Sequence, residues 1–351
     1  MSTETTRGRP AVALGTGTTV LTFVTVQLLA FAFAFTVELP GAYALFAVAS
    51  TGAVAYHRDR GAFGVAAATF GSVLLVALAL PLLMLVARQD PGIVVEKALD
   101  PAVHRALYLS VYAPMLAALL SVALGVPLAL VLARGFPGQA LVESLVDLPL
   151  VVPHSVAGLA VLFAYGDEGA FGWLEVSIPG AFTLLGVPVD VPLFDGFHYD
   201  FSVIGTTTGM VLAMTFVSAP FAVNAAREGF EAVDERVQRA ARTLGANRWE
   251  TFRRVTAPLS VRGVLTGGVL AWARAVSEFG AVAIVAYNVD VVYPPLFGER
   301  SETQHAPVFI YREFMTGGLD ESGAVATLLL ALSVAIFLVV RSLAYDDGGW
   351  P

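Results

Sequence analysis

The sequence lacks several residues on which common classes of protein depend. None of its 351 residues is cysteine, which excludes disulfides and thiolate metal sites. Its one lysine is Lys97, whereas a phosphate-binding P-loop needs a lysine between glycine and Ser or Thr. Because Lys97 lies between Glu96 and Ala98, the chain has no P-loop. Any ATPase on which it depends is therefore a separate polypeptide.

Charge is also scarce along the chain. Asp, Glu, Lys and Arg make up 14% of the residues and hydrophobic residues 57%, with a mean hydropathy of +0.75. A net charge of −8, without a basic patch outside one loop, argues against nucleic acid binding. Several uncharged runs exceed the roughly 20 residues that cross a bilayer. The composition therefore predicts an all-α polytopic protein of the cell membrane.

No group of residues predicts a catalytic or metal site. The histidines have no metal-ligand spacing, and the acidic pairs Asp167/Glu168 and Asp234/Glu235 are neighbours that do not converge on one substrate. The scattered histidines are His57, His104, His154, His198 and His305. We therefore expect no metal, no cofactor and no enzymatic activity in this chain.

Apolar runs with few or no charges divide the chain into eight predicted spans. Residues 1–10 form a polar tail that we expect to be disordered, and residues 346–351 form a second tail. Two short spans occupy residues 11–60, and a six-span core occupies residues 61–345. The spans are residues 11–37, 41–56, 61–87, 106–133, 139–166, 201–225, 263–287 and 323–340. Prolines and glycines within residues 171–189 argue against a further span there.

Basic residues predict the orientation. With the amino terminus in the cytoplasm, the cytoplasmic segments hold Arg7, Arg9, Arg58, Arg60, Arg134, Arg341 and the arginines of residues 226–262. The outer segments hold only Arg88, Lys97, Arg105, Arg300 and Arg312. Because positive residues favour the cytoplasmic side, this excess predicts that both termini and residues 226–262 are cytoplasmic.

Residues 226–262, here called the docking loop, form a charged island between uncharged runs. Its arginines are Arg227, Arg236, Arg239, Arg242, Arg248, Arg253, Arg254 and Arg262. Residues Phe230, Val233, Val237, Ala240, Ala241 and Leu244 recur at helical spacing and make one apolar stripe. Gly245 suits a left-handed helix end, and Asn247 with Glu250 predicts a capped second helix that Pro258 ends. The loop therefore predicts two short helices joined by a tight corner.

The docking loop resembles a signature of ABC-importer permeases, E-A-A-x-x-x-G followed, after nine intervening residues, by I-x-L-P. The matching or replacing positions are Arg239, Ala240, Ala241, Gly245, Val255 and Pro258. Arg239 stands in place of the family's glutamate. In that family the loop forms the coupling helix that fits a groove on the ATPase subunit, so we expect an acidic residue in that groove opposite Arg239. The alternative is a generic amphipathic cytoplasmic loop.

The resemblance extends over residues 65–345. Residues 107–134 and 147–153 are similar to the molybdate, tungstate and sulfate permeases, and residues 273–281 and 306–311 to the molybdate/tungstate branch. The likeness implies a six-span core working as a homodimer, with two ATP-binding ABC subunits and an external oxyanion-binding protein. The two spans of residues 11–56 are not part of that pattern.

Four residues are candidates for the translocation path or its gate. Arg274 and Glu278 are four residues apart, on one face of the seventh predicted span. A charge at mid-bilayer costs roughly 2.5–3.5 kcal/mol, so the two should pair or line a watery path. A gate and a structural salt bridge both remain open. Pro153 and His154 lie at a predicted helix bend, where a lone histidine more often bonds locally.

These observations predict the permease subunit of an ABC importer that carries tungstate or molybdate. A sulfate or thiosulfate importer is the alternative within the same class. A membrane sensor or enzyme without transport activity is the alternative from another class.

Overall fold

The computed structural model describes residues 16–57, 61–166, 169, 175–178, 181–184, 187–190, 197–200, 203–293 and 299–345. The predicted tails, residues 1–10 and 346–351, lie outside the described residues. The chain forms two compact units, Met1–Gln89 with Asp347–Pro351 and Asp90–Asp346. This boundary follows the third helix, whereas the sequence divided the chain after residue 60, and that functional division stays a prediction.

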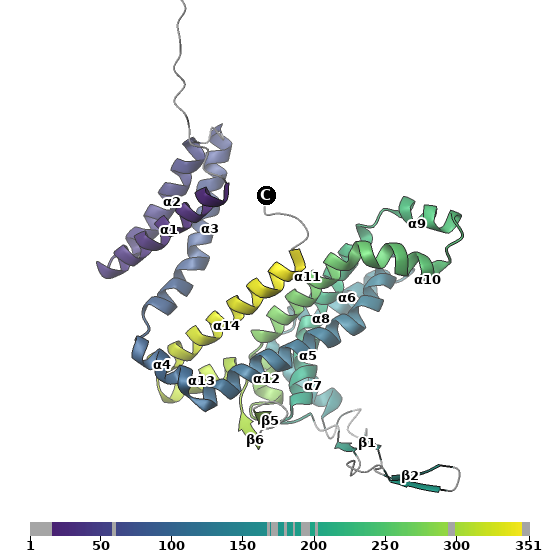
Figure 1. The fold of residues 1–351 in the computed structure, drawn as a ribbon. Coiled ribbons are helices and arrows are strands. Elements are labelled where there is room, and N and C mark those ends of the chain that lie inside the picture. Colours follow the sequence, from purple (N-terminus) through teal and green to yellow (C-terminus); the bar gives the residue numbers. More distant parts are fainter. Residues whose placement is uncertain are drawn as a thin grey trace, which may run out of the picture. The chain divides into compact units, whose positions relative to one another are not determined.

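The first unit consists of three apolar helices (Figure 1). They are α1 (Thr16–Thr36), α2 (Pro40–His57) and α3 (Gly61–Ala87), and they correspond to the first three predicted spans. Phe31 of α1 packs edge-on against Tyr43 of α2, with ring centroids 5.3 Å apart. Phe63 and Phe70 of α3 are 87% and 78% exposed. Such a largely exposed apolar surface suits contact with lipid hydrocarbon.

The second unit contains the rest of the described chain. Its first elements are α4 (Pro91–Leu99), α5 (Pro101–Leu132), α6 (Gln139–Val151), α7 (His154–Tyr165), β1 (Glu175–Ile178), β2 (Ala181–Leu184), β3 (Val187–Asp190) and β4 (Phe197–Asp200). Its later elements are α8 (Thr207–Glu231), α9 (Glu235–Thr243), α10 (Arg248–Thr251), the π-helical turn Phe252–Thr256, α11 (Ala257–Val276), α12 (Gly280–Val285), β5 (Val289–Tyr293), β6 (Glu299–Thr303), α13 (Ala306–Thr316) and α14 (Leu319–Tyr345).

Long helices dominate this unit, as predicted, and the described strands form three two-stranded antiparallel ladders. The ladders pair β1 with β4, β2 with β3, and β5 with β6. The first two occupy part of residues 167–200, where the sequence argued against a further span, and the described residues there contain no helix. The ladders add short strands to a fold that the sequence predicted as helical throughout.

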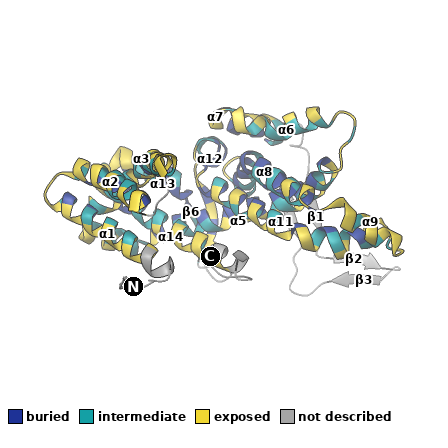
Figure 2. Cartoon of the chain, turned by 90° about the horizontal axis from the view of Figure 1, so that it is seen from above, coloured by how far each residue is buried: buried dark blue, intermediate teal, exposed yellow. Residues whose placement is uncertain are grey.

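Helices α5, α8 and α11 form the centre of the second unit (Figure 1). Leu109, Met210 and Met214 are fully buried between them and their neighbours. Buried residues concentrate along α8, whereas the outer helices are mostly exposed (Figure 2). Where α8 and α11 cross, Gly229 of α8 faces Gly263 of α11. There is no room for a side chain there, because a Cβ on Gly263 would lie 2.6 Å from the Cα of Gly229. The two helices therefore approach each other backbone to backbone.

We expect Gly263→Ala to destabilise the permease by about 1–3 kcal/mol, the usual cost of overpacking a tight contact. The thermal unfolding midpoint of the purified protein in detergent measures this effect. Gly71→Ala in α3 is the control, because the described residues leave open space around Gly71. An unfolding midpoint that rises with Gly263→Ala would contradict the close packing of α8 and α11.

The fifth and seventh predicted spans are not continuous helices. Residues 139–166 form α6 and α7, which are bent by 117° at a short break before His154. Pro153 lacks the N–H that would continue the helix, and it disfavours helical geometry at Val152. Residues 263–287 likewise divide at Ser277–Phe279, between α11 and α12. The bend that the sequence predicted at Pro153 and His154 is therefore present, whereas the break between α11 and α12 was not predicted.

Four described helices are long and apolar enough to cross a membrane, namely α3, α5, α8 and α14 through Val339. The bent pair α6–α7 would make a fifth span if it counts as one. Helix α5 begins at Pro101, five residues before the predicted start, because Asp100 caps it and accepts a hydrogen bond from the Ala102 N–H. The predicted division into six core spans and two additional spans stays a prediction.

The one lysine of the chain ties three helices together. Lys97 of α4 lies 2.7 Å from Glu313 of α13 and 2.7 Å from Glu321 of α14. Burial alone would lower the pKa of Lys97, but hydrogen bonds and charge from the two carboxylates outweigh burial and raise it. The pKa of Glu313 is lowered because Lys97 and Arg312 together outweigh its own burial. Both groups are therefore charged at neutral pH.

Candidate functional site

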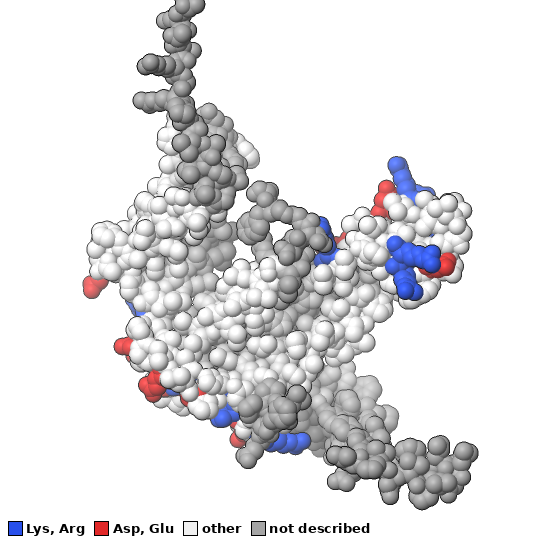
Figure 3. Space-filling view, viewed as in Figure 1, with Lys and Arg blue, Asp and Glu red and all other residues white. Residues whose placement is uncertain are grey.

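Charged side chains of the second unit gather toward its two ends on the face shown in Figure 3. One group lies over α9 and α10, and the other lies over α4 and α13, with a broad uncharged surface between them. The first group is the docking loop. An uncharged surface between two charged ends suits a protein that crosses a bilayer, because charged groups are costly in the hydrocarbon interior.

The docking loop has the corner that the sequence predicted. Gly245 follows α9 with a φ of +96°, the left-handed conformation that glycine adopts without strain. The side chain of Asn247 accepts a hydrogen bond from the Glu250 N–H, and Glu250 accepts one from the Asn247 N–H, each at 2.9 Å. This capping box satisfies two N–H groups at the start of α10.

Pro258 does not end the second helix, so that prediction is wrong. Helix α10 passes through the π-helical turn Phe252–Thr256 directly into α11, and Pro258 lies in the first turn of α11. The N–H of Ala257 bonds to the carbonyl of Phe252, five residues earlier. In the π-helical turn each N–H bonds to the carbonyl five residues earlier instead of four. This change comes just before Pro258, which has no N–H to donate. The docking loop is thereby joined to α11 without a break.

The apolar stripe of α9 faces outward. Val237 is 46% exposed and Leu244 is 89% exposed, and Ala240 between them is exposed as well. Only the amino-terminal members of the predicted stripe, Phe230 and Val233, are buried. An amphipathic helix normally buries its apolar face, and here no described residue covers it. The exposed stripe is therefore a surface for another molecule.

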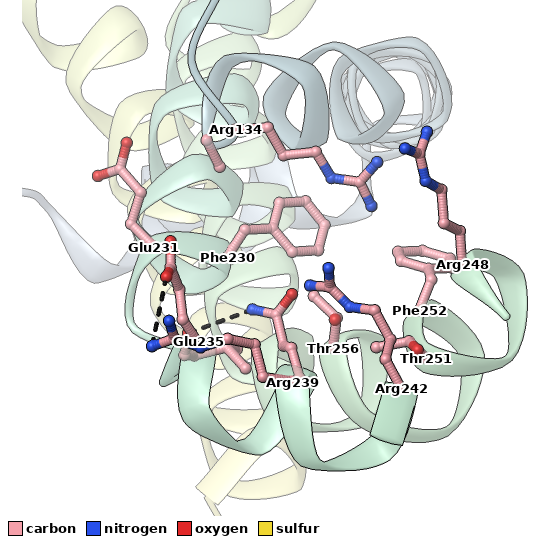
Figure 4. A pocket seen from close by; sticks show the side chains of 13 residues that line it. Arg134, Phe230, Glu231, Glu235, Arg239, Arg242, Arg248, Thr251, Phe252 and Thr256 are labelled. Carbon is pink, nitrogen blue, oxygen red and sulfur yellow. Dashed lines mark hydrogen bonds and ion pairs between the residues drawn. The ribbon is translucent and has the colours of Figure 1, made fainter. Parts of the chain in front are cut away.

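The opposite, polar face of α9 lines a cavity of about 550 Å³ (Figure 4). At roughly 100° per residue, Glu235, Gln238, Arg239 and Arg242 project almost opposite the apolar stripe. Arg239 lies 3.8 Å from Glu235 on its own helix. The positive charge that replaces the expected glutamate thus has a partner within the chain, and an acidic partner residue opposite Arg239 stays a prediction.

The four predicted path residues come together at the break between α6 and α7. An oxygen of Glu278 lies 2.7 Å from the Arg274 guanidinium and 3.7 Å from Nδ1 of His154. The Glu278 side chain is 0% exposed, that of Arg274 is 18% exposed and that of His154 is 52% exposed. Pro153 places His154 at the first position of α7. The cluster runs from a buried carboxylate to a half-exposed imidazole.

Hydrogen bonding assigns the tautomer of His154. The Arg274 guanidinium donates to Nε2 of His154 at 2.6 Å, so a neutral imidazole carries its proton on Nδ1, the nitrogen that faces Glu278. The other oxygen of Glu278 accepts a hydrogen bond from the Ala281 N–H at 2.9 Å, at the start of α12. The three side chains therefore connect α11, α7 and α12.

His305 adjoins this cluster but supplies no charge to it. It is 0% exposed, and burial lowers its pKa to about 3, although the neighbouring Glu278 backbone opposes the shift. The imidazole of His305 is therefore neutral at physiological pH. Arg274 is left as the permanent positive charge beside Glu278.

A second polar network between α6 and α8 was missed by sequence reasoning. Asn224 donates to Asp147 at 2.8 Å, and Arg227 lies 2.6 Å from Glu143 and 2.7 Å from Glu231. Glu143 and Asp147 are four residues apart on α6, and Asn224 and Arg227 are three residues apart on α8. Complementary polar stripes on two apolar helices were the available signal, because polar groups within a membrane need partners.

Comparison with known proteins places these features in a family. The model of the family described as "Binding-protein-dependent transport system inner membrane component" matches residues 121–346. The molybdate/tungstate transport system permease protein of Thermococcus kodakarensis is 35% identical over 277 residues, covering 78% of this chain and 93% of that protein. A probable sulfate transport system permease protein of Chlorokybus atmophyticus is 31% identical over 277 residues, covering 76% and 84%.

A solved structure has a similar fold at much lower identity. A chain in the crystal structure of a bacterial alginate ABC transporter, in complex with an alginate pentasaccharide-bound periplasmic protein, superimposes with a TM-score of 0.59 at 15% identity. The likeness covers 84% of this chain and 99% of that chain. The chain described here therefore belongs to the binding-protein-dependent transport system inner membrane components, the permeases of ABC importers.

Proposed function

We propose that this chain is the permease subunit of an importer that moves tungstate or molybdate into the cytoplasm. Two copies form the pathway, a separate ATP-binding subunit docks on each copy, and an external binding protein delivers the oxyanion. The amino and carboxyl termini and the docking loop are cytoplasmic. Permeases of this family are not themselves ATPases, which agrees with a chain that has no P-loop.

The exposed apolar stripe of α9 is the observation that carries this proposal. Val237, Ala240 and Leu244 form an apolar surface on a loop that is otherwise strongly charged. A coupling helix needs such a surface, because an amphipathic helix binds a groove through its apolar face. The continuous helix from α10 into α11 would carry movement of the ATPase to the membrane part.

The Arg274–Glu278–His154 cluster is our candidate for the gate. It lies where two pairs of helices break, α6 from α7 and α11 from α12. Broken helices in membrane proteins are tolerated where protein or a watery cavity satisfies the freed backbone groups. The buried Glu278 carboxylate contacts Arg274 of α11 and the Ala281 N–H of α12, and Arg274 in turn donates to His154 of α7. These contacts can favour a closed pathway until ATP binding separates the helices.

The substrate class rests on the relatives. The relative from Thermococcus kodakarensis is named for molybdate and tungstate, and the relative from Chlorokybus atmophyticus is named for sulfate, which makes sulfate the second candidate. All three anions are tetrahedral dianions that guanidinium groups and backbone N–H groups can hold. The choice among tungstate, molybdate and sulfate would then be made chiefly by the external binding protein.

The complex of permease, ATPase and binding protein in proteoliposomes tests this proposal. We expect tungstate or molybdate to stimulate ATP hydrolysis several-fold over the unstimulated rate, as substrate delivery does when it favours the closed ATPase dimer. Sulfate serves as the competing substrate. Stimulation by sulfate alone would make sulfate the substrate in place of tungstate or molybdate. A permease that assembles with no ATPase would overturn the proposal that the chain belongs to an importer.

A further inference from the structure

The cavity behind α9 has walls from four parts of the second unit. They are the end of α5, the end of α8, the polar face of α9, and the segment from α10 into the π-helical turn. The volume is about 550 Å³, which exceeds the roughly 30 Å³ share of one water molecule many times. The cavity can therefore hold a hydrated ion or the end of a larger molecule.

The charges that line this cavity are unbalanced. Arg134, Arg239, Arg242 and Arg248 line it together with Glu231 and Glu235. Glu231 pairs with Arg227 at 2.7 Å, and Glu235 lies near Arg239. Among the described residues, no carboxylate lies within ion-pair distance of Arg134, Arg242 or Arg248. All three arginines are exposed, and three positive charges thus line one solvent-accessible cavity without an ion-pair partner.

These three arginines come from separate elements. Arg134 follows α5, Arg242 is in the last turn of α9, and Arg248 begins α10. In Figure 4 the side chains of Arg134 and Arg242 reach toward the space beside Phe230 from opposite sides, and Arg248 lies near Phe252. The two rings, with centroids 6.5 Å apart, form the apolar part of a lining that is mostly polar.

We propose that this cavity binds a tetrahedral oxyanion, either free in solution or as the phosphate of a lipid headgroup. Guanidinium groups bind such anions through paired, charge-assisted hydrogen bonds, and an anion would relieve the repulsion among the three arginines. A carboxylate of the ATPase fits less well, because the apolar docking stripe lies on the opposite face of α9.

Binding of an anion would connect α5, α9 and α10 through one ion. The docking stripe would then be held in a fixed position relative to the membrane helices before the ATPase arrives. Anion binding at the three arginines does not require transport or the ATPase. The site is therefore testable on the permease alone, separately from the proposed import activity.

The experiment compares two triple variants of the full-length permease. R134Q/R242Q/R248Q removes the arginines without an ion-pair partner, and R236Q/R253Q/R262Q removes three docking-loop arginines that are equally exposed but do not line the cavity. Equilibrium dialysis of detergent-purified protein with radiolabelled orthophosphate measures a free anion. Native mass spectrometry of protein taken from membranes containing phosphatidylglycerol measures retained lipid.

We expect the pocket variant to bind orthophosphate at least about tenfold more weakly than the wild type, because each lost guanidinium removes a charge-assisted hydrogen bond. The control variant should retain wild-type binding. If only retention of phosphatidylglycerol falls in the pocket variant, the phosphate comes from lipid. If both variants behave alike in both measurements, the site does not exist.

One further result and one fallback comparison keep the test decisive. Loss of ATPase binding by the pocket variant, with unchanged anion and lipid binding, would assign the arginines to the partner interface and overturn the proposal. If the triple variant fails to fold, R242Q alone is compared with R236Q, since both residues lie on the same short helix.

Discussion

Glu278→Gln is expected to lower ATP-driven oxyanion uptake by about a hundredfold or more, because removing one partner of a buried ion pair destabilises the packed cluster by about 3–5 kcal/mol and about 1.4 kcal/mol corresponds to a factor of ten. The variant keeps the shape of the side chain but leaves the Arg274 guanidinium, 18% exposed, without its carboxylate. His154, whose Nε2 accepts from Arg274, cannot replace the lost negative charge. Uptake of tungstate or molybdate into proteoliposomes measures the effect.

The double variant R274A/E278A separates the two interpretations of this pair. If the pair only stabilises packing, removing both side chains leaves no uncompensated charge, although the Ala281 N–H and Nε2 of His154 lose their partners. Uptake should then recover most of the loss seen with Glu278→Gln. If the pair is part of the gate, uptake stays impaired or becomes uncoupled from ATP hydrolysis. Normal coupled uptake by the double variant would therefore remove the gate from the proposed function. Binding of the ATPase to both variants serves as the control for folding.

Local features of the site were predictable from the sequence because they depend on a few neighbouring residues. The left-handed Gly245 and the capping box of Asn247 and Glu250 each complete their hydrogen bonding within one turn of chain. Arg274 and Glu278 meet because residues four apart share one face of a helical turn. None of these contacts needs information from a distant segment.

Features that depend on distant segments were not predictable in the same way. His154 is 120 residues from Arg274 in the sequence, and only the bend between α6 and α7 brings the two side chains together. Periodicity located the apolar stripe of α9 but could not say which face the rest of the chain would cover. Pro258 was read as a helix end because proline usually is one, and the π-helical turn before it changes that outcome.

The additional apolar helices illustrate a further limit of sequence reasoning. Helices α1 and α2 formed as expected, and Gln27 donates to Ser50 between them at 2.9 Å. Polar groups that pair inside an apolar helix group favour association within a membrane. Helix α2 nevertheless falls short of a full span by hydropathy, because it carries small and polar residues at many positions, and Val20–Thr36 of α1 is apolar but shorter than a full span.

The double variant V237S/L244S is expected to abolish stable assembly with the ATPase. Val237 and Leu244 are 46% and 89% exposed in the permease alone, and burying such side chains in a groove contributes about 1.5–3 kcal/mol each when burial is complete. Losing both would weaken the complex by about a hundredfold or more, since about 1.4 kcal/mol corresponds to a factor of ten. Co-purification of the ATPase with the tagged permease, followed by titration in detergent, measures the change.

Arg236→Ser is the matched control, because Arg236 is an exposed residue on the flank of the same helix. It should leave the affinity for the ATPase within about threefold of the wild type, as changes outside the centre of an interface usually do. Because the substituted side chains make up the exposed stripe, their loss should leave the fold of the permease intact. Wild-type assembly by V237S/L244S would mean that the ATPase binds elsewhere, and the exposed stripe of α9 would then need a different partner.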